Sequence, residues 1–209
     1  THLVFAASRE EEFVHKINGL SYAEIAAKGG GILNSAQKIA LASEDELYEQ
    51  AMARLHHLMK LGTGAIEIKS GYGLNTANEL KMLRVIKRIK ETAPIPVKSS
   101  FLGAHTYPLD FKENHEGYIK QIIEEMLPVI AQEKLADYID VFCEDGFFSV
   151  TETKRICEAG KGYGLKPKIH ANQLHASGGV ELGVQIGAVS VDHLETMNDA
   201  AIQALSKST

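Results

Sequence analysis

Short apolar, β-branched runs alternate along this chain with longer segments of helical period, and this alternation restricts the fold more than any other feature. Strands that are separated by helices do not form hairpins, so they are expected to pair side by side in one parallel sheet. The pattern therefore predicts the α/β fold class. The predicted strands cover residues 2–6, 65–69, 96–102, 138–143, 167–171 and 188–192.

The segments between these strands carry the signals of amphipathic helices. Ser43 with Glu46, and Ser149 with Glu152, have the spacing of a capping box, in which each side chain bonds the backbone N–H of the other residue. Apolar side chains then recur every three or four residues, which predicts that one face of each helix packs on the sheet. Two such stripes are Leu47, Ala51, Leu55 and Leu58, and Ile119, Ile122, Ile123, Met126 and Ile130.

The number of predicted strands favours an incomplete barrel. A closed parallel β/α barrel has eight strands, and six are predicted here. We expect residues 1–209 to form a partial (β/α)8, TIM-like barrel of about six units, as a fragment of a longer protein that begins within a strand at Thr1. Residues 7–42 make an unusually long connection, and long connections after barrel strands usually build the active site.

Composition narrows the class of partner. The formal net charge of −5 gives no electrostatic reason to expect nucleic acid or an anionic membrane surface, so a small molecule is the expected partner. No apolar run is long enough to cross a bilayer. The two cysteines, Cys143 and Cys157, form no recognisable disulfide or C-x-x-C pattern. Together these features predict a cytoplasmic protein with reduced thiols.

Polar side chains suited to metal binding or proton transfer recur where the predicted strands end. Carboxyl ends of barrel strands meet at one mouth, so residues far apart in sequence would share a site there. An isolated histidine is more often a surface or satisfied core residue, but histidines at successive strand ends favour function. The residues at strand ends are Tyr72, His105, Glu144, His170, Asp192 and His193, and His2 opens the first strand.

Arg9 has two interpretations. It lies beside the acidic run Glu10 to Glu12, so it is either part of a solvated charge cluster or a bidentate clamp for a substrate carboxylate. The remaining histidines lie on predicted helices or loops and are interpreted as structural or solvated; they are His15, His56, His57, His115 and His175.

Seven motifs occur in one order along nearly the whole chain, and together they are far more specific than any single one. In this set and order, they resemble the imidazolonepropionase family of metal-dependent amidohydrolases. The resemblance implies a small flanking β domain and strands seven and eight outside this chain. The motifs are THLVFAASRE, SYAEI with GGGI, EIKSGYGL, FLGAH, DVFCEDGFFS, KIHANQL and SVDHL.

The resemblance also implies a metal site. In that family the first strand ends in His-x-His, and Thr1-His2 matches its last two positions, so His2 and His170 would be two of four ligands. The other two, a preceding histidine and an aspartate at the end of strand eight, fall outside the chain. His193 would act beside one divalent metal, Zn²⁺ or Fe²⁺, which the ligand types suit equally.

Further roles follow by motif. Substrate contacts would come from Arg9, Tyr22, Tyr72 and His105. Some family members have a proton-transferring glutamate where this chain has Gln173, and an amide orients water or substrate but does not titrate.

The implied reaction is hydrolysis of the ring C–N bond of 4-imidazolone-5-propanoate to N-formimino-L-glutamate, with metal-activated water attacking the ring carbonyl. The resemblance also points to a homodimer. Two alternatives stay open. Another cyclic amidohydrolase or a deaminase would share the metal site but would not need the carboxylate clamp at Arg9. A barrel-derived binding protein without catalysis would explain the absent ligands in another way.

Overall fold

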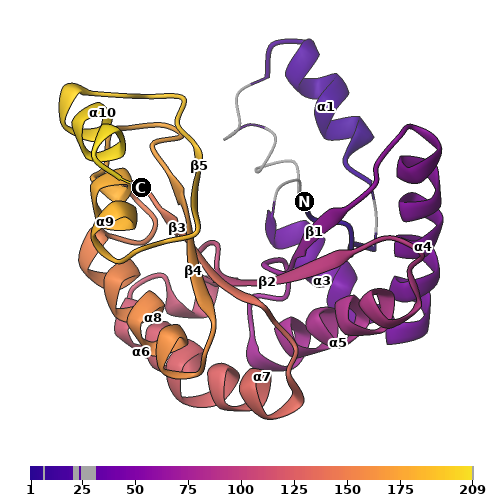
Figure 1. Cartoon of the computed structure of the whole chain (residues 1–209). Helices are drawn as coiled ribbons and strands as arrows, with labels where there is room; N and C mark the ends of the chain where they lie inside the picture. Colours follow the sequence, from indigo (N-terminus) through magenta and orange to yellow (C-terminus); the bar gives the residue numbers. More distant parts are fainter. Residues whose placement is uncertain (7, 21–23, 25–31, 209) are drawn as a thin grey trace.

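A computed structural model describes residues 1–6, 8–20, 24 and 32–208. Its centre is a five-stranded sheet in the order β1-β2-β3-β4-β5, in which every neighbouring pair is parallel (Figure 1). Consecutive strands are therefore neighbours, as in a β/α barrel. The strands are β1 (Ile66–Lys69), β2 (Val97–Ala104), β3 (Tyr138–Cys143), β4 (Lys166–Ala171) and β5 (Ser190–His193).

The sheet curls strongly, and contacts between its two outer strands demonstrate this. β1 and β5 lie at opposite ends of the strand order, yet Lys69 Nζ on β1 lies 3.1 Å from Asp192 Oδ2 on β5. Lys168 Nζ on β4 likewise lies 2.5 Å from Glu67 Oε2 on β1. Side chains from nonadjacent strands therefore meet on the concave face. The described residues form a curled part of a barrel, and within them the barrel does not close.

Helices cover the convex face of this sheet (Figure 1). Each crossover between neighbouring strands contains helix, which is what the alternating sequence pattern predicts. The helical elements in these crossovers are α5 (Thr76–Thr92), η1 (Leu109–Phe111), α6 (His115–Lys120), the π-helical turn η2 (Gln121–Met126), α7 (Leu127–Glu133), α8 (Val150–Gly162) and α9 (Gly179–Gln185). Helix α10 (Asp199–Ser206) follows β5.

In the described part of the chain, the helices α1 (Glu10–Ile17), α3 (Ile32–Leu41) and α4 (Glu44–Lys60) precede β1. The first two lie within the long connection of residues 7–42, and α4 packs against α5. Both predicted capping boxes are present, at the starts of α4 and α8. Among the described helices, none is long and apolar enough to span a membrane.

The predicted strand over residues 2–6 is wrong. Among the described residues, the backbone hydrogen bonds between the N-terminal end of the chain and β1 both involve Thr1, which precedes this segment: its amino group donates to Glu67 O, and Lys69 N–H donates to its carbonyl. The guanidinium of Arg54 donates a hydrogen bond to the carbonyl oxygen of Leu3. Without a continuing ladder the segment is not a strand, although Leu3 and Val4 are buried as the apolar pattern predicts.

Candidate active site

The carboxyl ends of the five strands bring most of the predicted residues to one mouth. Tyr72 follows β1 by three residues, and His105 directly follows β2. His170 is the penultimate residue of β4, and His193 is the last residue of β5. Parallel register accounts for this alignment: His170 pairs with Asp192, so the ends of β4 and β5 lie level.

Three aromatic rings stack at the β1 side of the mouth. The ring centroid of His2 lies 4.4 Å from that of Tyr72 and 5.1 Å from that of His105, and the two imidazoles are nearly parallel at 6°. Tyr72 and His105 are 5.5 Å apart. We call His2, Tyr72 and His105 the ring cluster. Stacking at these distances holds flat surfaces in register without requiring a charge.

The imidazoles of the ring cluster favour their neutral forms. Burial lowers the pKa of His105 to about 4, and burial also lowers the pKa of His2. His105 Nδ1 lies 3.0 Å from the carbonyl oxygen of Gly71, which only accepts, so Nδ1 carries the proton and donates. In the neutral ring Nε2 is then an acceptor. His2 Nδ1 is buried and has no hydrogen-bond partner in the described part of the chain.

Arg9 lies beside the ring cluster. Its guanidinium carbon is 5.2 Å from the centroid of Tyr72, within the range of a cation–π contact. Its Nε and one terminal nitrogen donate to Ser35 Oγ at 3.1 and 2.9 Å, and its side chain is 35% exposed. Its Nε also lies 4.0 Å from Glu12 Oε2, so Arg9 pairs with the acidic run as the charge-cluster interpretation has it. The contact with Tyr72 places the same guanidinium next to the predicted substrate residues.

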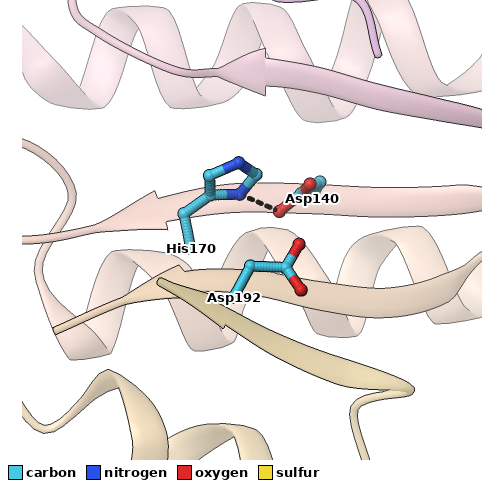
Figure 2. Close-up of side chains that lie close together, drawn as sticks. All are labelled: Asp140, His170 and Asp192. Atoms are coloured by element: carbon cyan, nitrogen blue, oxygen red, sulfur yellow. Dashed lines mark hydrogen bonds and ion pairs between the residues drawn. The ribbon is translucent and has the colours of Figure 1, made fainter. Parts of the chain in front are cut away.

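A buried carboxylate organises the opposite side of the mouth. Asp140 on β3 is fully buried, and its Oδ1 accepts from His170 Nδ1 at 2.9 Å, as Figure 2 shows. Its Oδ2 accepts from Lys69 Nζ at 2.8 Å. An acceptor at Nδ1 fixes that nitrogen as the protonated one and leaves Nε2 of His170 free as a ligand atom. This is how metal-ligating histidines are commonly held.

Lys69 links several strands through ion pairs. Besides Asp140, it contacts Asp192 at 3.1 Å and Glu67 at 3.4 Å. Burial opposes the charge of Lys69, but the surrounding carboxylates outweigh it and raise its pKa. Burial likewise opposes ionisation of Asp140, yet the hydrogen bond from His170 and the charge of Lys69 hold its pKa below the usual range. We call Lys69, Asp140, His170 and Asp192 the charged cluster.

Ligand atoms of Asp140, His170 and Asp192 lie within 4.8 Å of one another, which is close enough for a shared cation. Lys69, however, contacts both carboxylates and already supplies a positive charge between them. The charge balance therefore favours a metal on the Nε2 side of His170 rather than between Asp140 and Asp192.

A second group, Glu144, Asp145 and His175, also has ligand atoms within 4.8 Å. Glu144 follows β3, as its strand-end position in the sequence predicted. Its buried carboxylate accepts backbone N–H groups of Leu174, His175 and Asp145. Through these bonds Glu144 has a structural role: it holds the loop after β4 against the loop after β3.

Comparison with known proteins identifies relatives along nearly the whole chain. An imidazolonepropionase of Flavobacterium johnsoniae is 60% identical over 98% of this chain and 50% of its own length. One from Christiangramia forsetii is 57% identical over 98% and 50%, and one from Shewanella sp. is 47% identical over 100% and 51%. The chain belongs to the imidazolonepropionase family. It spans about half the length of the curated relatives it matches.

Solved structures agree with the fold of this family member. A 5-methylcytosine deaminase of Klebsiella pneumoniae liganded with 5-fluorocytosine superposes with a TM-score of 0.54 at 14% identity, over 74% of this chain and 36% of that one. The same enzyme liganded with phosphonocytosine gives 0.52 at 16% identity. At such identities the likeness concerns the barrel fold alone. No family model matches the chain.

Backbone strain is concentrated at the mouth of the partial barrel. Leu74, Asn172, His193 and Leu194 all have positive φ angles, between 54° and 78°, and all lie at or just after the end of a strand. Among described residues, the other non-glycine case is Lys134, which ends α7. Such conformations are unfavourable for residues with a Cβ and persist where surrounding structure enforces them, often at functional sites.

Two predicted residues lie close to this strained backbone. The His193 ring is 5.2 Å from that of His170, and its Nδ1 is 3.3 Å from Glu195 Oε1. Gln173 follows Asn172 in the loop after β4, where it is partly buried. Tyr22 lies outside the described residues.

Sequence patterns missed two residues that the fold brings into the site. Asp140 and Lys69 lie within the β3 and β1 strand patterns, and only their partners on other strands explain their placement. A charged residue inside an otherwise apolar strand was the available signal, because a buried charge requires a partner.

Proposed function

We propose that this chain supplies most of the catalytic barrel of an imidazolonepropionase, which hydrolyses 4-imidazolone-5-propanoate to N-formimino-L-glutamate. The observation that carries the proposal is the 60% identity to the Flavobacterium johnsoniae imidazolonepropionase over 98% of this chain. The ring cluster beside Arg9 adds chemical support, since a flat ring with a carboxylate tail needs both a stacking surface and a cation.

The donor set fits one divalent metal, Zn²⁺ or Fe²⁺. His170 has Nε2 free while Asp140 holds Nδ1, and His2 has a buried Nδ1 without a partner in the described residues. Imidazole nitrogens are ligands that both metals accept. When bound, such a metal polarises a carbonyl and makes water a nucleophile near neutral pH. Two further ligands would come from the rest of the protein.

The residues on the β1 side would bind the substrate. Arg9 would pair with the propanoate through charge-assisted hydrogen bonds, and Tyr72 would offer its ring face to the imidazolone. His105 presents Nε2 as an acceptor in its neutral tautomer, which suits a ring N–H of the substrate. Tyr22 is proposed as a further contact from its motif alone.

The residues on the β4 and β5 side would take part in proton transfer. His193 lies beside His170, and its imidazole would polarise the substrate carbonyl or carry the proton to the leaving nitrogen. Gln173 would orient water or substrate through its amide, because an amide does not act as a general base.

The organisation of the whole protein is also a proposal. Residues 1–209 would form a partial catalytic barrel, with strands seven and eight and a flanking β domain from the rest of the chain. The resemblance to the family supports a homodimer in the cytoplasm.

The test is turnover of 4-imidazolone-5-propanoate by the full-length protein, with metal content measured on the same samples. His170→Ala should lose both bound metal and turnover, because its Nε2 is the proposed ligand atom. His57→Ala, on the exposed face of α4, is the control and should retain both. Absence of turnover in the metal-loaded wild type would overturn the function, and stoichiometric metal in His170→Ala would overturn the ligand.

A further inference from the structure

Glu79 is a fully buried carboxylate in the first turns of α5, and it faces back toward the loop that follows β1. Its Oε2 accepts the backbone N–H of Gly71 at 3.0 Å. Its Oε1 accepts those of Gly73 at 2.6 Å and Leu74 at 3.2 Å. These three N–H groups flank Tyr72 on both sides, so one carboxylate holds the loop on either side of that ring.

Among the described residues, no lysine, arginine or histidine forms an ion pair with Glu79. An ionised carboxylate without a cation is unfavourable in the interior unless several hydrogen bonds satisfy it. Helix capping does not explain its position, because Asn75 already caps α5 by accepting the N–H of Asn78 at 2.9 Å. The hydrogen bonds that the Glu79 carboxylate accepts therefore serve to hold the loop after β1.

The loop is shaped around this carboxylate. Gly71 and Leu74 have φ angles of 109° and 55°, in the left-handed region that turns successive N–H groups inward. A Cβ on Gly73 would lie 2.3 Å from the backbone nitrogen of Glu79, so the loop backbone rests directly on the helix. A positive φ is unfavourable for Leu74, which has a Cβ, and this strain lies where the carboxylate makes its bonds.

The held loop in turn places two members of the ring cluster. Gly71 donates its N–H to Glu79, and its carbonyl oxygen accepts from His105 Nδ1 at 3.0 Å. Tyr72, between the bonded residues, stacks on His2 at 4.4 Å. Glu79 touches none of these rings, but it determines where the backbone that carries or contacts them lies.

We infer that Glu79 is a positioning residue for substrate binding, acting through the loop of residues 70–74 to orient Tyr72 and His105. This inference rests on the proposed function, in which those two side chains contact the imidazolone ring. The chemistry it serves is recognition of a flat, five-membered ring bearing N–H groups. The metal ligands His2 and His170 are not hydrogen-bonded to Glu79, so metal binding should not depend on it.

The experiment compares full-length wild type with Glu79→Gln, which keeps the shape but turns one acceptor into a donor that faces an N–H group. Amide hydrogen exchange over residues 70–74 should accelerate by at least about tenfold, as expected when buried backbone bonds open more readily. kcat/KM for 4-imidazolone-5-propanoate should fall at least about tenfold, mainly through KM, with metal content unchanged. Ser43→Ala, which removes an exposed cap of α4, is the control and should change neither.

Each other result has a defined meaning. Unchanged exchange in Glu79→Gln would overturn the role of Glu79 in holding the loop. Faster exchange with kcat/KM within about twofold of wild type would show a purely structural group and overturn the positioning role. If wild type itself fails to hydrolyse the substrate, the proposed function fails, while exchange still decides whether Glu79 holds the loop. If Glu79→Gln does not fold, Glu79→Asp, which keeps the charge but is one methylene shorter, is judged by the same two measurements.

Discussion

The two sides of the mouth are held together by different forces. The ring cluster at the β1 and β2 ends consists of stacked side chains, with neutral imidazoles and one bond to a backbone carbonyl. The charged cluster joins β1, β3, β4 and β5 through ion pairs of 2.8 to 3.1 Å, centred on a fully buried aspartate. One side depends on shape, and the other depends on paired charge.

This difference predicts unequal tolerance of change. Removing one neutral ring from a stack removes its contact area and a modest stacking energy, about 0.5–1.5 kcal/mol per aromatic pair. A buried charge that loses its partner is left unsatisfied, which is far more unfavourable. The charged cluster is therefore expected to govern stability and the geometry of His170, whereas the β1 side is expected to govern affinity for the substrate.

The largest expected effect comes from Asp140→Ala. The substitution leaves Lys69 buried beside weaker partners and frees His170 Nδ1, so the full-length protein should lose about 3–5 kcal/mol of unfolding free energy and much of its metal. Denaturant titration and metal analysis measure the two effects. Asp45→Ala, which breaks an ion pair whose carboxylate is 83% exposed, should lose less than about 1 kcal/mol. Equal losses in the two variants would remove the contrast between buried and exposed charge.

The next effect tests Arg9 as the cation of the β1 side. Arg9→Ala should lower kcat/KM for imidazolone propanoate by about a hundredfold with normal metal content, and Arg9→Lys should recover only part, because it lacks the planar fork. Arg88→Ala is a matched control, since Arg88 also stacks on a tyrosine, at 3.8 Å from the ring of Tyr48, but on the outer surface. Near wild-type kcat/KM in Arg9→Ala would contradict the carboxylate clamp and support the interpretation of Arg9 as part of a solvated charge cluster.

The smallest effect concerns pH. Burial lowers the pKa of His105 to about 4 from an ordinary value near 6.5, so between these values the unfolded chain binds more protons than the folded one. Stability of the metal-free full-length protein should therefore fall as pH drops from about 6.5 to about 4, by at most about 1.4 kcal/mol per pH unit from this group. His105→Gln should flatten the slope of unfolding free energy against pH. An unchanged slope would mean that folding does not lower the pKa of His105.

Much of the fold was predictable because its signals are local. The strand at 138–143 was predicted at its exact bounds, and the strands at 65–69, 96–102, 167–171 and 188–192 were placed within two residues at each end. The capping boxes at Ser43 and Ser149 depend on residues three apart, so the sequence suffices to find them. The segment 2–6 has the same apolar pattern but lacks the hydrogen-bonded ladder of a strand.

What the sequence by itself determined is which side chains stand at the ends of strands, since strand pattern and position follow from neighbouring residues. Only the tertiary structure decided which of them meet. Lys69 and Asp192 are 123 residues apart and lie on the two outer strands, and the curl of the sheet brings them within 3.1 Å. Asp140 gained its role in the same way, because its donors Lys69 and His170 lie on other strands, and no local pattern of residues encodes those partners.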